Sequence, residues 1–310
     1  LPDGNFPTAP YPNPEIREAF ACALKTAEEV HPDIIIATDP DSDRAGTAVL
    51  SGDEYKLLGG NEIGMLLFNY IFENRKKLGT LPQNPVAVKS IVSTDICKKI
   101  AAQYGCELRD VLTGFKFIGE QITELEKIGQ VGRYVFGFEE SFGYLPGPYV
   151  RDKDAVGAAM LICEMAAFYK EQGLNLLEVL EGIYKRYGYY LSAQKSFTCE
   201  GQAGMKQIAS IMESIRNNPP KSIGSKSVSV FKDINTSVET ILKTGEQRKI
   251  SLPKSNVLIF EFGDGATIIV RPSGTEPKIK IYVCAVAPER GEAEQLLCEM
   301  VESGTKLLGF

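Results

Sequence analysis

Short apolar runs alternate with amphipathic stretches along much of the chain, and this alternation restricts the possible folds more than any other feature. Residues 15–30 repeat apolar side chains at helical spacing, and an uninterrupted apolar run follows at residues 34–37. A run without polar alternation is typical of a parallel strand that is buried on both faces. Helix and strand together form half of a βαβ unit, so we expect a layered α/β architecture.

The same pattern continues beyond residue 56. Three further segments have helical periodicity, at residues 63–77, 95–104 and 155–169. Residues 86–88 are strand-like. We expect Asn61 to cap the first of these helices, Gly79 to end it, and Asp152 or Asp154 to cap the helix at 155–169. The sequence therefore predicts α/β layers with a mixed sheet up to about residue 185.

The composition of secondary structure changes after Tyr187. Strand-like and helical segments are then expected in this order: strand 190–199, helix 202–217, strands 228–231, 257–262, 266–270 and 278–286, and helix 289–306. Many strands with only two helices are typical of an α+β domain with an antiparallel sheet. We expect this smaller domain to follow the α/β layers.

Composition excludes several classes of function. A net charge of −6 argues against general nucleic-acid binding, which needs a surplus of Lys and Arg on one face. No apolar run approaches the roughly 20 residues that cross a bilayer, so we expect no membrane partner. Seven cysteines without a CxxC pair favour reduced thiols and a cytoplasmic location. A lone histidine, His31, excludes Ser-His-Asp chemistry within this sequence.

An acidic segment follows the first apolar run. Residues 38–44 read Thr-Asp-Pro-Asp-Ser-Asp-Arg, and ligands of α/β sheets collect beyond the carboxyl ends of strands. Three alternating carboxylates repel one another unless a cation neutralises them, and Mg²⁺ prefers such oxygen ligands. A solvated acidic turn is the alternative. An EF-hand is excluded, because Arg44 and Leu50 occupy its glycine and glutamate positions.

Three other segments carry groups that bind sugars or phosphates. Residues 137–144, Gly-Phe-Glu-Glu-Ser-Phe-Gly-Tyr, offer carboxylates and a hydroxyl for ring hydroxyls, although an ordinary strand and turn would look similar. Residues 271–277, Arg-Pro-Ser-Gly-Thr-Glu-Pro, could surround a phosphate or simply form a β-turn. Lys116, in Thr-Gly-Phe-Lys, is either a surface cation or a proton donor near phosphate.

Together these segments resemble the site loops of the α-D-phosphohexomutases, which interconvert the 1- and 6-phosphates of hexoses. The string that ends in Arg-Asp-Lys-Asp at 151–154 is more similar to the branch with long phosphoglucomutases and phosphopentomutases. The resemblance runs from end to end of the chain and implies Mg²⁺ as the cofactor. It implies these roles: metal ligands Asp39, Asp41 and Asp43; catalytic groups Arg44 and Lys116; sugar contacts Glu139 and Ser141; phosphate contacts Arg271, Ser273, Gly274 and Thr275, with Lys280 a weaker addition.

The resemblance also implies a domain order and a reaction. Residues 1–55 would be part of a second α/β domain, 56–185 a third, and 186–310 the C-terminal α+β domain. The family transfers a phosphoryl group through an enzyme phosphoserine and a sugar bisphosphate, with glucose 1-phosphate or glucose 6-phosphate as the substrate expected here. The serine segment, similar to Thr-Ala-Ser-His-Asn-Pro, does not occur in this sequence, so we expect these residues alone to be inactive.

Two other functions remain open from the sequence. A noncatalytic module that binds sugar phosphates would use the same loops without turnover. A metal-dependent phosphatase would hydrolyse phosphate esters with these residues alone.

Overall fold

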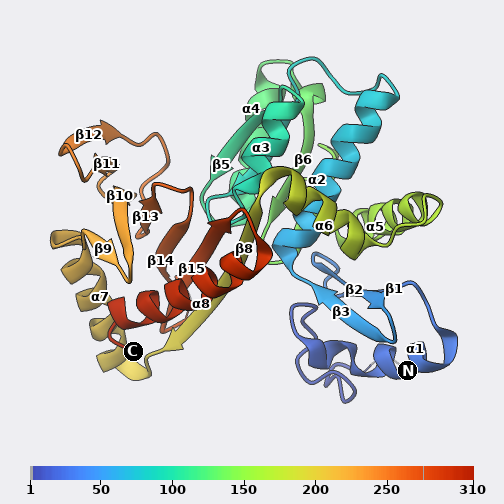
Figure 1. Ribbon diagram of the computed structural model, residues 1–310, viewed down its shortest axis with the longest axis horizontal. Helices are drawn as coiled ribbons and strands as arrows, with labels where there is room; N and C mark the ends of the chain where they lie inside the picture. Colours follow the sequence, from blue (N-terminus) through green and yellow to red (C-terminus); the bar gives the residue numbers. More distant parts are fainter. Residues whose placement is uncertain (1–2, 275) are drawn as a thin grey trace. The chain divides into compact units, whose positions relative to one another are not determined.

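The computed structural model describes residues 3–274 and 276–310 (Figure 1). The chain forms two compact units, Leu1–Arg186 and Tyr187–Phe310, and each is described by itself. Unit 1 contains two sheets with helices around them, and unit 2 contains one larger sheet. The prediction of mixed α/β layers followed by a smaller α+β domain with an antiparallel sheet is confirmed.

The first sheet of unit 1 has three antiparallel strands in the order β1-β2-β3. These strands are β1 (Ile34–Thr38), β2 (Ala45–Ser51) and β3 (Glu54–Leu58). The 3₁₀ turn η1 (Arg17–Phe20) and helix α1 (Ala21–Val30) cover one face, where Phe20 and Ala27 pack with Ile35 and Ala48.

The prediction of a parallel strand at 34–37 is wrong. Ile34 pairs with Val49 in an antiparallel register, and the chain returns directly through a hairpin loop at residues 39–44. The apolar run is only partly buried along β1, so it did not require helices on both faces. An antiparallel pair needs only a short connection, whereas a parallel pair needs a crossover.

The second sheet of unit 1 has the strand order β5-β4-β6-β7. Strands β4 (Val86–Ser90), β5 (Glu107–Val111) and β6 (Tyr134–Glu139) are parallel, and β7 (Gly143–Leu145) is antiparallel to β6. The helical elements of this part are α2 (Gly60–Lys77), α3 (Ile96–Gln103), α4 (Phe115–Lys127), η2 (Val131–Arg133), α5 (Ala155–Lys170) and α6 (Leu176–Tyr187).

Two helices enclose this parallel sheet from opposite faces. Phe68 of α2 stacks on Phe136 of β6, while Ile118 and Ile122 of α4 pack with Val88 of β4. Buried apolar surface on both faces stabilises the sheet. The carboxyl ends of β4, β5 and β6 are therefore the part of the sheet where polar loops can collect.

Of the helix caps predicted for unit 1, that of α5 is confirmed and that of α2 is wrong. Asp154 caps α5 as predicted, because its Oδ1 accepts the Gly157 N–H at 3.0 Å. The predicted cap of α2 by Asn61 is wrong. Gly59 precedes that helix and donates its N–H to Glu62 Oε2 at 2.8 Å, whereas Asn61 Oδ1 accepts the N–H of Thr94.

Unit 2 is built on an antiparallel sheet in the order β12-β11-β10-β13-β14-β15-β8, with β9 paired to β10. Its strands are β8 (Tyr189–Thr198), β9 (Ser222–Ile223), β10 (Lys226–Asp233), β11 (Val238–Ile241), β12 (Glu246–Lys249), β13 (Leu258–Phe262), β14 (Thr267–Pro272) and β15 (Lys278–Ala287). Helices α7 (Gly201–Asn217) and α8 (Arg290–Leu307) contribute Met212 and Met300 to a core with Phe260, Ile268 and Ile281.

None of the helices in the described ranges combines the length and the apolar character that crossing a lipid bilayer demands.

Candidate functional site

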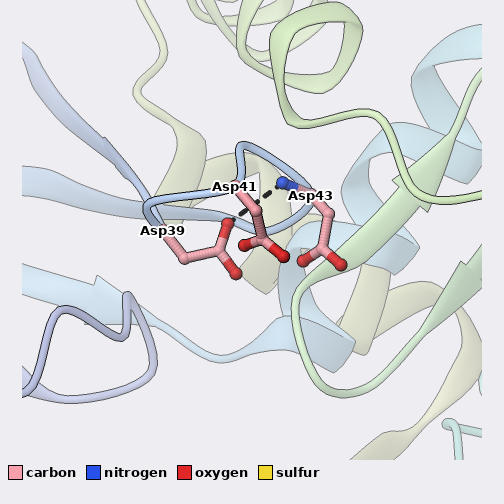
Figure 2. Close-up of side chains that lie close together, drawn as sticks. All are labelled: Asp39, Asp41 and Asp43. Carbon is pink, nitrogen blue, oxygen red and sulfur yellow. Dashed lines mark hydrogen bonds between the residues drawn. The ribbon is translucent and has the colours of Figure 1, made fainter.

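The loop between β1 and β2, residues 39–44, brings its three aspartates together. Asp39 Oδ1 accepts the N–H groups of Asp43 and Arg44 at 3.0 and 2.9 Å, which folds the loop back on itself. One carboxylate oxygen from each of Asp39, Asp41 and Asp43 lies within 4.8 Å of the others. Figure 2 shows the three side chains gathered around this turn. We call residues 39–44 the metal loop.

The donors of the metal loop fit a hard divalent cation. Asp43 Oδ1 is buried and, among the described residues, no group hydrogen bonds to it. Burial raises the pKa of Asp39, and the nearby carboxylate of Asp43 raises it further despite two backbone N–H donors. Both observations indicate crowded negative charge that a cation bound through oxygen would relieve.

Two cations of the chain already contact these aspartates. Arg44 lies 2.9 Å from Glu15 Oε1 and 3.7 Å from carboxylate oxygens of Asp39 and Asp43. Lys153 Nζ lies 2.8 Å from Asp43 Oδ2 and 3.0 Å from Asp152 Oδ1. Burial lowers the pKa of Lys153, but these two carboxylates raise it above its ordinary value overall.

Sequence reasoning assigned no role to Lys153. A lysine between two aspartates, as in Asp152-Lys153-Asp154, usually indicates a solvated run of charges. In the structure its side chain is only 14 % exposed, crosses Gly143 and lies over the Phe115 ring. The one available signal was the position of this string soon after the residues at 137–144.

Main-chain hydrogen bonds join the metal loop to the residues that follow β6. We call residues 139–143 the glutamate loop. Ala45 donates its N–H to the carbonyl of Phe142 at 3.1 Å, and Arg44 forms an isolated antiparallel bridge with Gly143. Ala155 donates its N–H to the carbonyl of Ser42, also at 3.1 Å. The metal loop and the glutamate loop therefore form one structural assembly, although about 100 residues separate them in sequence.

The backbone of this assembly includes two residues in left-handed conformation. Ser42 has φ 57° and Phe142 has φ 66°, and neither is a glycine. Non-glycine residues in this region cost about 1 kcal/mol or more each, and they persist where surrounding contacts hold them. Here each residue presents its carbonyl to an N–H of the facing segment.

The two predicted sugar contacts lie in the glutamate loop. Glu139 is 5 % exposed, and its Oε1 accepts the N–H of Gly114 at 2.5 Å. Ser141 is half-buried in the turn before β7. Gly114 directly precedes α4, which carries the exposed Lys116 in its first turn. The Thr-Gly-Phe-Lys segment thus contacts the glutamate loop through its backbone.

The predicted phosphate contacts lie in unit 2, in the connection between β14 and β15. We call residues 271–277 the phosphate loop. Arg271 pairs in register with Lys280 and donates from Nη1 to the Tyr282 hydroxyl at 3.2 Å. Ser273 donates its N–H to the carbonyl of Lys278 at 2.8 Å, and Gly274 follows in an exposed bend. Thr275, the remaining predicted contact, lies outside the described residues.

The chain matches three domain families of known proteins. These are phosphoglucomutase/phosphomannomutase alpha/beta/alpha domain II over residues 1–52, alpha/beta/alpha domain III over residues 59–187, and the C-terminal domain over residues 223–302. The chain belongs to the α-D-phosphohexomutase family. The metal loop lies in the first match and the glutamate loop in the second, so the predicted resemblance is confirmed.

Curated relatives carry the same name in several bacterial strains. The phosphoglucomutases of Staphylococcus aureus strains MRSA252 and N315 are each 39 % identical over 303 residues, which is 97 % of this chain and 53 % of theirs. The chain therefore spans about half the length of the curated relatives it matches.

Solved structures share the fold at lower identity. The phosphoglucomutase pp63/parafusin of Paramecium, in an open form, matches with a TM-score of 0.65 at 19 % identity, over 96 % of this chain and 50 % of its own. A phosphoglucomutase/phosphomannomutase family protein of Burkholderia thailandensis matches with a TM-score of 0.60 at 15 % identity, over 98 % and 53 %.

Proposed function

We propose that the chain is the part of a phosphoglucomutase that holds the divalent cation and the sugar phosphate. The reaction proposed is transfer of a phosphoryl group between the 1- and 6-positions of glucose, or the 1- and 5-positions of a pentose. It proceeds through an enzyme phosphoserine and a sugar bisphosphate. One observation carries the proposal: main-chain hydrogen bonds hold the acidic metal loop directly against the glutamate loop.

Each group of the site has a role in this proposal. Asp39, Asp41 and Asp43 would hold Mg²⁺, which when bound supplies electrostatic stabilisation of a transferring phosphoryl group. Arg44 neutralises charge and donates hydrogen bonds to phosphate oxygens, and Lys116 donates to a transferring oxygen and can give it a proton. Glu139 and Ser141 accept and donate hydrogen bonds with ring hydroxyls. The phosphate group is assigned to Arg271, Ser273, Gly274 and Thr275.

Several further statements belong to the same proposal. The predicted domain limits of 1–55, 56–185 and 186–310 stay a prediction. The cytoplasmic location is supported by seven cysteines that are all free thiols. The preference for glucose is supported by the name of the Staphylococcus relatives, which are phosphoglucomutases. The absence of the serine segment from the printed sequence supports inactivity of these residues alone.

Two measurements on the purified 310-residue chain test the proposal. Calorimetry with glucose 1-phosphate should show binding in the presence of Mg²⁺, and a coupled assay for glucose 6-phosphate should show negligible turnover. Asp41→Asn removes an exposed ligand and should lower Mg²⁺ affinity at least tenfold, since each carboxylate adds charge to the site. Glu120→Gln, an exposed substitution on α4, is the matched control.

Three results would contradict parts of the proposal. Turnover at the rate of a complete phosphoglucomutase would refute the argument from the missing serine. Release of inorganic phosphate from glucose 1-phosphate would favour the phosphatase. Binding without any serine-bearing segment in the complete protein would favour the noncatalytic module.

A further inference from the structure

The second acid of the glutamate loop, Glu140, has no role in the proposed function, yet a ring of hydrogen bonds surrounds it. Its N–H donates to Ser93 Oγ at 3.1 Å, and its Oε2 accepts the hydroxyl of Ser90 at 2.9 Å. The two serine oxygens lie 2.8 Å apart. Ser93 Oγ also lies 3.5 Å from Glu140 Oε2, so both hydroxyls are within hydrogen-bond distance of the carboxylate and of each other.

Both serines lie at or just after the carboxyl end of β4. Ser90 ends β4 and Ser93 follows in the next turn, and both side chains are buried. The Ser93 N–H donates to the carbonyl of Ser90 at 3.0 Å. Glu140 is therefore attached, by main chain and side chain together, to one ordered turn after β4.

A buried ammonium group stabilises that turn. Lys89 is fully buried, and its Nζ donates to the carbonyl of Ser93 at 3.0 Å. It also lies 2.9 Å from a carboxylate oxygen of Asp95 and 2.9 Å from one of Asp110. Burial lowers the pKa of Lys89, but Asp110 and Asp95 raise it above its ordinary value overall, so the charge persists. The Lys89 ammonium thus links the carbonyl of Ser93 to two carboxylates.

The two glutamates attach the loop in two directions. Glu139 accepts the N–H of Gly114, which follows β5, whereas Glu140 contacts the turn after β4. Since β4 lies between β5 and β6, the loop after β6 is connected to the ends of both other parallel strands. Ser141, the proposed sugar contact, is the next residue.

Backbone contact fixes the loop from a third side. A Cβ on Gly60, the first residue of α2, would come within 1.9 Å of the carbonyl oxygen of Glu140. The main chain of Glu140 therefore lies against the start of α2. The side chain that leaves this point contacts the Ser90 and Ser93 hydroxyls.

We propose that Glu140 is a positioning residue: its carboxylate, bound by Ser90 and Ser93, holds Glu139 and Ser141 in the conformation that binds the sugar. The identity of the ligand rests on the proposed function, whereas the effect on the loop does not. The carboxylate acts as a hydrogen-bond acceptor, so an amide of the same shape should replace it.

Hydrogen–deuterium exchange of the 310-residue chain tests the effect on the loop. Glu140→Ala should speed exchange of the amides at 140–145 at least tenfold and leave the amides of α4 unchanged. Glu140→Gln should restore protection, because its amide oxygen still accepts from Ser90. Glu120→Ala, an exposed glutamate of α4, is the control. Unchanged protection in Glu140→Ala, or no rescue by Glu140→Gln, overturns the proposal.

A second variant covers the case in which Glu140→Ala does not fold. Ser90→Ala removes the donor to the carboxylate and should loosen the same amides. If Glu140→Ala does not fold, unchanged protection in Ser90→Ala alone overturns the proposal. If Glu140→Ala folds, adding Ser90→Ala to it should cause no further loosening, because the two groups act through one contact. Fully additive effects would show that they act separately and would overturn the proposal.

Calorimetry with α-D-glucose 1-phosphate and Mg²⁺ tests the consequence for binding. Glu140→Ala should weaken binding at least tenfold, while Glu140→Gln should stay within threefold of the unchanged chain. Equal weakening by both variants would mean that the charge itself is required and would overturn the positioning role. If the unchanged chain does not bind this probe, the proposed function fails, and the exchange experiment alone decides the role of Glu140.

Discussion

The metal and glutamate loops differ from the phosphate loop in how the chain holds them. The first two lie far apart in sequence and share main-chain hydrogen bonds, such as that from Ala45 to Phe142. The phosphate loop joins two neighbouring strands and is held by them, as in the pairing of Arg271 with Lys280. A loop of the second kind depends on its own hairpin. The metal and glutamate loops depend on each other and on the sheet that carries them. Substitutions far from these loops in sequence should therefore change their conformation.

The largest effect should come from the buried ammonium in unit 1. Lys89→Met leaves the carboxylates of Asp95 and Asp110 without their main partner, and breaking such a buried pair costs about 3–5 kcal/mol. The free energy of unfolding, measured with urea, should fall by that amount. Lys77→Met removes an exposed pair with Glu73 and should cost only a few tenths of a kcal/mol. Equal losses would show that Lys89 is dispensable.

A glycine at the start of α2 should produce the next largest effect. Gly60→Ala places a methyl group against the carbonyl oxygen of Glu140, and such overpacking costs about 2–3 kcal/mol. Thermal or urea unfolding measures the loss. Gly291→Ala, at the start of α8, meets no atom within 4 Å and should be neutral or slightly stabilising. A neutral Gly60→Ala would mean that the glutamate loop moves freely.

Removal of the Arg271 guanidinium in unit 2 should affect binding without affecting the fold. Arg271→Ala should weaken glucose 1-phosphate binding by about 1–3 kcal/mol if it makes a charge-assisted hydrogen bond. Its unfolding curve should stay close to that of the unchanged chain, because its hairpin keeps its strand pairing. Arg248→Ala, on exposed β12, is the control for binding. Unchanged calorimetry for Arg271→Ala would remove this residue from the site.

The smallest effect is a dependence of stability on pH. Burial raises the pKa of Asp95, but Lys89 and Lys98 lower it below its ordinary value overall. A carboxyl with a lowered folded pKa adds stability above its unfolded pKa of about 4 and loses it as pH falls through the folded value. Asp95→Asn should therefore cost about 1 kcal/mol at pH 6 and progressively less below pH 4. Urea unfolding of the variant and of the unchanged chain measures this cost. A difference in free energy of unfolding that stays the same between pH 3 and pH 6 would contradict the prediction.

The sequence predicted the regular parts of the fold because their patterns are local. Helical spacing and apolar runs located helices α2, α3 and α5, strand β4 and most strands of the antiparallel sheet. They did not locate β5, β6, α4 or α6. Strand β2 was also not predicted, because Ala45-Gly46-Thr47-Ala48 has no strand-like alternation. These residues are buried, and Gly46 lies against Pro14 and Phe20. Such burial depends on tertiary packing that local patterns do not show.

The candidate site was predictable as separate loops but not as an assembly. The alternate spacing of Asp39, Asp41 and Asp43 predicted a cation site, and the structure brings their oxygens together. Their partner Lys153 and the serines at 90 and 93 carry no comparable signal, because a serine or lysine in the sequence does not reveal which carboxylate it will meet. Those contacts are set by the order of strands in the sheet.

The longest strand pairing of unit 2 has a consequence for how that unit is made. Strand β8 pairs with β15 along its whole length, from Tyr189 with Ala287 to Thr198 with Lys278. These partners are about 90 positions apart, so the ribosome must release nearly all of unit 2 before β8 can find its neighbour. Until then both edges of β8 lack a partner strand, whereas in the folded unit β15 covers one of them. Nascent protein should therefore need protection from aggregation until translation has passed β15.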